Sequence, residues 1–136
     1  MTQYIVVRRD LNLSLGKLIS QCVHASSINT SKLEGYYSDK PPRVVTLYVK
    51  SEAKMLKIID ECQKQRIPIG AQYDSGINEV DHNTLTVLSI GPTDIDTSKI
   101  LKRVQAVTGG CDFSFKSAND TINKEVGEIF KRNPAL

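Results

Sequence analysis

Short runs of β-branched and other apolar residues alternate along this chain with segments whose apolar residues recur at helical spacing. The runs at residues 4–7, 43–49, 69–73 and 85–90 are typical of buried strands. The three helical segments carry their apolar residues at Leu15, Leu18, Ile19, Cys22, Ala25 and Ile28; at Met55, Leu56, Ile59 and Cys62; and at Ile100, Leu101, Val104 and Val107. The resulting order, β-α-β-α-β-β-α, predicts an α/β protein with one mostly buried sheet and helices on both faces.

Local signals give the expected ends of these helices. The first begins at Leu15, after a mostly polar loop, and is expected to end near Gly35, because glycine favours a helix stop. Ser51 is expected to cap the second helix, and Pro68 follows it. The third is expected to run from residue 96 or 97 to residue 107, and Gly91-Pro92 closes the strand before it.

The chain has 136 residues, which fits one domain of ordinary size. We expect this domain to occupy residues 1–108, since Gly109-Gly110 interrupts the pattern. Residues 109–136 are expected to form a C-terminal extension packed on the same domain. This extension should be helical, because apolar residues recur in it at i, i+4, i+7 and i+8, namely Ile122, Val126, Ile129 and Phe130.

Composition excludes several classes of protein. No apolar run approaches the roughly 20 residues that span a bilayer, and no signal-peptide core precedes the first strand, so we expect a cytoplasmic protein. The cysteines, Cys22, Cys62 and Cys111, are odd in number and unclustered, which argues against a disulfide framework and a zinc site.

The net charge is only +3, but it is unevenly distributed, since residues 1–70 hold 11 Lys and Arg against 6 Asp and Glu. This excess is compatible with a phosphate-facing surface and equally with ordinary solvated side chains.

Three motifs occur in a fixed order. The first comprises Val6-Val7-Arg8, Asp10-Leu11 and residues 16–25, which read Gly-Lys-Leu-Ile-Ser-Gln-Cys-Val-His-Ala; the second is Asp74-Ser75-Gly76, and the third is the run from Thr84 to Gly91-Pro92. Together they resemble the archaeal- and eukaryotic-type peptidyl-tRNA hydrolases over about residues 3–108.

The resemblance implies hydrolysis of the ester that joins a peptide to the terminal ribose of tRNA, which recycles tRNA for translation. It also implies a mixed four-stranded sheet between helical layers, a homodimer, and no metal or organic cofactor. The family's active-site lysine, aspartate and threonine fall on Lys17, Asp74 and Thr86. The residues expected to bind the substrate are Arg8, Gln21, His24 and Asn78.

Ester hydrolysis needs an activated water, a proton for the leaving oxygen and donors for the developing oxyanion. We expect Asp74 to position the water and Lys17, near a helix N-terminus, to stabilise negative charge. Each residue also has a structural interpretation. Asp74 is compatible with an Asx-turn, Lys17 with a solvated lysine, Thr86 with a strand hydrogen bond, and His24 and Gln21 with packing roles.

The motifs also depart from the family pattern within the expected site. Leu13-Ser14-Leu15-Gly16-Lys17 stands where the family has Met-Gly-Lys-Gly-Lys, and Ile77-Asn78-Glu79 stands where it has Arg-Thr-Gln. The loss of cations should weaken tRNA binding, although Arg8 and Arg9 offset part of that loss. Two hypotheses follow: a hydrolase that uses Lys17, Asp74 and Thr86, and a non-catalytic module that binds tRNA or a protein. Hydrolysis of another acyl ester or amide is a third, for which the sequence indicates no substrate.

Overall fold

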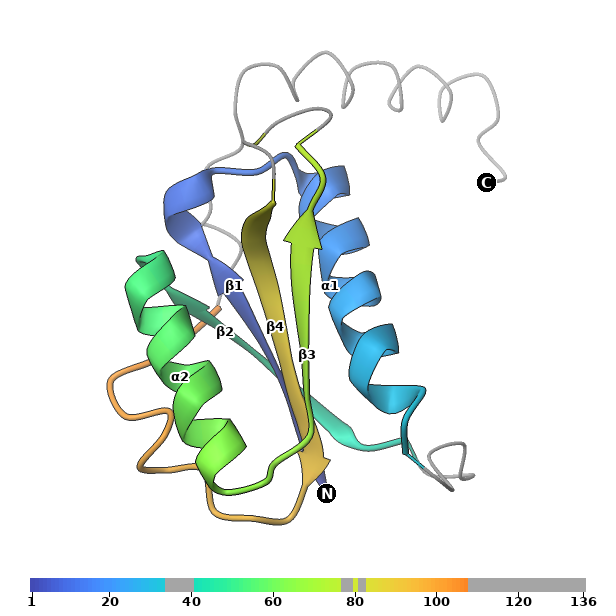
Figure 1. Cartoon of the computed structure of the whole chain (residues 1–136), viewed down its shortest axis with the longest axis vertical. Coiled ribbons are helices and arrows are strands. Elements are labelled where there is room, and N and C mark those ends of the chain that lie inside the picture. Colours follow the sequence, from blue (N-terminus) through green and yellow to red (C-terminus); the bar gives the residue numbers. More distant parts are fainter. Residues whose placement is uncertain (34–40, 77–79, 81–82, 108–136) are drawn as a thin grey trace, which may run out of the picture.

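The computed structural model describes residues 1–33, 41–76, 80 and 83–107. Its elements are β1 (Thr2–Arg8), the 3-10 turn η1 (Arg9–Leu11), α1 (Leu15–Thr30), β2 (Arg43–Val49), α2 (Glu52–Lys64), β3 (Ile69–Asp74), β4 (Thr84–Thr93) and β5 (Gln105–Ala106). The described strands form one five-stranded sheet in the order β3-β4-β1-β2-β5. Figure 1 labels β1 to β4 of this sheet. The α/β class predicted from the sequence is confirmed.

The sheet is mixed. β1 and β2 run parallel and are joined through α1, whereas β4 pairs antiparallel with both β1 and β3, and β5 pairs antiparallel with β2. Parallel neighbours need such a crossover connection, which places its helix against one face of the sheet. The carboxyl ends of β1 and β2 therefore lie at the same end of the sheet as the start of α1.

Alternate residues of the strands point to opposite faces of the sheet, and each face packs against a helix. Ile5, Val7 and Val87 face α1 and pack with its Ala25. On the other face, Val6, Leu88 and Ile90 pack with α2 through a larger cluster that includes Met55, Ile58 and Cys62. Figure 1 shows the sheet between the two helices. No helix within the described ranges is long and apolar enough to cross a membrane.

The predicted third helix, from residue 96 or 97 to residue 107, is wrong. The backbone N–H of Leu101 donates to the Thr97 carbonyl at 2.9 Å and that of Val104 to the Leu101 carbonyl at 3.1 Å, so residues 98–103 form turns. Arg103 has a φ of 65°, in the left-handed region, which ends any helix. The chain then extends into β5, so the sheet has five described strands and not four.

The capped ends of the two helices agree better with the sequence. The Ser51 side chain accepts a hydrogen bond from the Lys54 N–H, which confirms the predicted cap of α2. The Ser14 side chain accepts one from the Lys17 N–H, so α1 begins at Leu15 as expected, but it ends at Thr30, before Gly35. The predicted helical extension at residues 109–136 lies outside the described residues.

α1 approaches β3 closely at Gly70. A Cβ built on Gly70 would lie 2.3 Å from the Ala25 carbonyl oxygen and 3.0 Å from the Asn29 nitrogen, both of which are backbone atoms. The buried Asn29 side chain donates on to the Gly91 carbonyl, and its Oδ1 accepts from the Ser89 hydroxyl at 3.1 Å. The absence of a side chain at Gly70 therefore sets the distance between α1 and the β3–β4 half of the sheet.

Gly70→Ala is expected to lower the free energy of unfolding by about 1 to 3 kcal/mol, because the new methyl group forces backbone apart from backbone. Gly16→Ala is the matched control, since a Cβ there meets nothing within 4 Å. Urea unfolding of both variants measures the effect. Equal stability of the two variants would contradict the close approach at Gly70.

Candidate active site

Lys17 and Asp74 form an ion pair between the first turn of α1 and the last residue of β3. Lys17 Nζ lies 2.8 Å from Asp74 Oδ1, and the exposed fractions of the two side chains are 15% and 6%. Asp74 Oδ2 accepts the backbone N–H of Gly76 at 2.9 Å, which is the Asx-turn that the sequence allowed. The turn and the ion pair coexist because each uses a different carboxylate oxygen.

The surroundings of Asp74 favour its ionised form. The hydrogen bond from Lys17 lowers the pKa of this carboxyl below its ordinary value, and the N–H groups of Gly76 and Ser75 act in the same direction. Burial opposes them, but it does not reverse the direction. Asp74 is therefore a carboxylate at neutral pH, with Lys17 as its counter-charge.

Gln21 and Thr86 form a second link between α1 and the sheet, one helical turn from the first. The Thr86 hydroxyl donates to Gln21 Oε1 at 2.6 Å and lies 3.1 Å from the Gln72 carbonyl oxygen. Thr86 is the extra residue of a β-bulge, since Gln72 pairs with Val87 and Tyr73 pairs with Leu85. The bulge turns the hydroxyl towards α1 and buries it completely.

The link uses the oxygen of the Gln21 amide and not its nitrogen. Within the described residues, this nitrogen donates to no group, although Gln21 is buried. Because Lys17 and Gln21 are four residues apart, they lie on the same face of α1.

The Arg8 guanidinium, expected to bind substrate, is held by the protein itself. Its Nη2 lies 2.6 Å from Asp10 Oδ2, its Nε donates to Asp10 Oδ1 at 3.1 Å, and its Nη1 donates to the Leu85 carbonyl at 2.9 Å. This bidentate pairing is a strong form of arginine–carboxylate contact. Arg8 thereby fixes the strand residue that precedes Thr86.

The remaining predicted site residues are His24 and Asn78. His24 is exposed on α1, so the packing role that was its structural interpretation is wrong. Asn78, with Ile77 and Glu79, lies outside the described residues. The sequence interpretation missed Ser14 as the cap that positions Lys17, although a serine directly before an apolar helical run is a usual start signal. It also missed Asp10 as the partner of Arg8.

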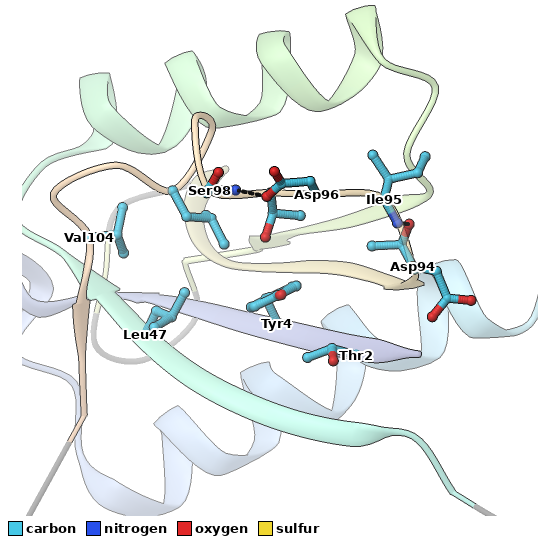
Figure 2. Close-up of a pocket in the computed structure, with 11 residues that line it drawn as sticks. Thr2, Tyr4, Leu47, Asp94, Ile95, Asp96, Ser98 and Val104 are labelled. Carbon is cyan, nitrogen blue, oxygen red and sulfur yellow. Dashed lines mark hydrogen bonds between the residues drawn. The ribbon is translucent and has the colours of Figure 1, made fainter.

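A separate cavity of about 530 Å³ lies on the α2 face of the sheet. Figure 2 shows Tyr4, Leu47 and Val104 around it, with Asp94 and Asp96 on the segment that follows β4. The Asp94 carboxylate pairs with the N-terminal amine at 3.2 Å. Neither Lys17 nor Asp74 lines this cavity, so it is not part of the candidate site. Among the described residues, no three His, Cys, Asp or Glu side chains are grouped to hold a metal ion.

The site thus combines a paired carboxylate, a cation, the Gln21 amide and the first turn of a helix. Such a set can orient a water molecule and stabilise an oxyanion. It contains no serine or cysteine paired with a histidine among the described residues, as nucleophilic catalysis by a triad would require.

Comparison with known proteins gives one consistent family. The model of the family "Peptidyl-tRNA hydrolase PTH2" matches residues 1–107. A peptidyl-tRNA hydrolase of Haloquadratum walsbyi is 33% identical over 97 residues, which is 68% of this chain and 86% of that protein. One from Methanococcus maripaludis is 33% identical over 98 residues, covering 66% of this chain and 84% of its own length.

A probable peptidyl-tRNA hydrolase 2 of Drosophila melanogaster is 29% identical over 102 residues, which is 68% of this chain and 55% of the fly protein. The match to the family model extends through every described strand and helix, including the segments that carry Lys17, Gln21, Asp74 and Thr86. The chain belongs to the PTH2 family of peptidyl-tRNA hydrolases.

Proposed function

We propose that this protein hydrolyses the ester between the peptide and the 3′ end of peptidyl-tRNA through Lys17 and Asp74. The observation that carries the proposal is their ion pair of 2.8 Å, formed at the N-terminus of α1 by two residues that match the family's motif. The comparisons favour this hydrolase over a non-catalytic binding module on the same scaffold.

In the proposed mechanism, Asp74 orients the attacking water. Its lowered pKa makes it a weak base, and a carboxylate still has lone pairs for a water after accepting from Lys17 and Gly76. Lys17 stabilises the oxyanion that develops on the ester carbonyl, assisted by the positive end of the α1 dipole. As the bond between the water oxygen and the ester carbonyl carbon forms, the attacking water loses a proton. When the bond from that carbon to the ribose oxygen breaks, a proton is taken up by the ribose oxygen, so that the free acid of the peptide and the free 3′ hydroxyl of tRNA result.

The other predicted residues support this chemistry in different ways. We assign Gln21 to substrate binding, because its amide nitrogen donates to none of the described residues and Gln21 shares one face of α1 with Lys17. We assign Thr86 to holding Gln21, because its hydroxyl is completely buried in this conformation. Arg8 then acts through Leu85 and not on the substrate. His24 and Asn78 remain proposed contacts for the substrate.

We further propose that the protein acts in translation in the cytoplasm, and as a homodimer. An exposed apolar stripe at i, i+4 and i+8 on α1, formed by Leu15, Ile19 and Val23, supports association through this helix. These large side chains face away from the sheet, where burial against a second copy would remove them from water.

Asp74→Asn is expected to lower kcat by about 10²- to 10⁴-fold, since the amide cannot accept as a carboxylate does from the attacking water. Binding of deacylated tRNA should change little, because the Asx-turn acceptor and Lys17 remain. Release of labelled acyl-amino acid from N-acetyl-aminoacyl-tRNA measures the rate. Asp60→Asn, at an exposed carboxylate of α2, is the matched control, and an unchanged kcat in Asp74→Asn would remove Asp74 from the mechanism.

Thr86→Val is expected to lower kcat by about 10- to 100-fold at temperatures where the variant is folded, because Gln21 loses the bond that orients it. Thr86→Ser keeps the hydroxyl and should restore most of the rate. The same release assay tests both, with circular dichroism to verify folding. A valine variant as fast as the parent would show that Thr86 has no part in positioning Gln21.

A further inference from the structure

Positive side chains gather at a cleft between α2 and the turns that follow β4. The cleft has a volume of about 290 Å³, and its charged lining residues are Lys54, Lys57, Glu61, Lys99, Lys102 and Arg103. We call it the basic cleft. It lies on the α2 face of the sheet, whereas Lys17 and Gln21 belong to α1 on the other face.

The cations of the basic cleft are not neutralised by the described part of the chain. None of the five forms a salt bridge with a described residue. Glu61 is the acidic residue of the lining. Its Oε1 lies 3.6 Å from Nζ of Lys64, a residue that does not line the cleft. Asp96 adds one negative charge near Lys99, but it also accepts the Ser98 N–H at 2.9 Å. An excess of positive charge therefore remains.

The fold does not need these charges. Lys57, Lys99, Lys102 and Arg103 are exposed, and only Lys54 is half-buried, with its Nζ donating to the Lys102 carbonyl at 3.4 Å. Packing between α2 and the turns comes instead from apolar residues of the larger core cluster, namely Met55, Ile58, Cys62, Ile100, Leu101 and Val104. Like charges held together at a surface raise the free energy of the folded state, unless an anion binds there.

The basic cleft is connected to the candidate active site through the first turn of α2. Glu52 Oε2 lies 3.8 Å from Arg8 Nη1, and the same nitrogen donates to the Leu85 carbonyl, next to Thr86. Lys54 follows Glu52 by two residues on α2. The first turns of α2, which carry Lys54 and Lys57, therefore lie at the same end of the sheet as Lys17 and Asp74.

We propose that the basic cleft binds the sugar–phosphate backbone of tRNA at a distance from the ester; this inference rests on the proposed function. The described lining of the cleft holds lysines and an arginine and no aromatic residue, which suits contact with phosphates and not the reading of bases. Such contacts raise affinity for long substrates, make it salt-dependent and leave the chemical step to Lys17 and Asp74.

The test compares two substrates, N-acetyl-aminoacyl-tRNA and the same acyl ester on the trinucleotide CCA. In the double variant Lys57→Glu/Lys102→Glu, the ratio of kcat/KM for the long substrate to that for the short one should fall at least about tenfold. Lys32→Glu/Arg43→Glu changes the same number of charges at exposed positions outside the cleft, and should keep the parent ratio.

Salt dependence provides a second readout. The slope of log Kd for deacylated tRNA against log salt should become shallower by about 1.4 to 1.8 in the cleft variant, as expected for two lost phosphate contacts. An unchanged ratio and slope would overturn the basic cleft as a tRNA site. If the parent hydrolysed neither substrate, the proposed function would fail, and the tRNA affinities of the cleft and control variants would still decide whether the cleft binds RNA.

Discussion

The close approach of α1 to β3 is the constraint on which the site depends. At Gly70 the backbone of the strand meets the backbone of the helix, with the Ala25 carbonyl in the space that a Cβ would fill. This contact places the face of α1 that carries Lys17 and Gln21 against the ends of β3 and β4. A wider separation would break both links between helix and sheet, although neither link touches Gly70 itself.

The contacts of Lys17 with Asp74 and of Gln21 with Thr86 are better explained by the proposed hydrolysis than by a contribution to the stability of the fold. A largely buried ion pair gains little net stability, because desolvation of both charges offsets their attraction. The same arrangement keeps Asp74 ionised and Lys17 fixed, as the proposed hydrolysis requires. Arg8 also supports this part of the site. It binds both Asp10 and the carbonyl of Leu85, and so supports the β-bulge at Thr86.

The sequence predicted most elements where local signals agree with tertiary pairing. The run that became β2 (Arg43–Val49) and the cap at Ser51 are examples. It failed at residues 96–107, because the spacing of Ile100, Leu101 and Val104 suits consecutive turns as well as a helix, and pairing with β2 then determines the outcome. The motif match indicated Lys17 and Asp74, but the burial of Thr86 depends on a bulge whose register is set by partner strands. Likewise, the exposure of His24 depends on which side of α1 meets the sheet. The polar residues Gln21 and Asn29 are buried there with Ala25, whereas apolar residues of the helix are exposed, so apolar spacing alone does not give the buried side.

Lys17 and Asp74 are proposed to act together in ester hydrolysis, and a double-mutant cycle on kcat measures this coupling. Lys17→Met, Asp74→Asn and the double variant would be compared in single-turnover hydrolysis of N-acetyl-aminoacyl-tRNA. Residues that act as a unit give non-additive losses. The double variant should therefore be about as slow as the slower single variant. Losses that multiply across the two sites would show that each residue acts independently of the other, and would rule out joint action of Lys17 and Asp74.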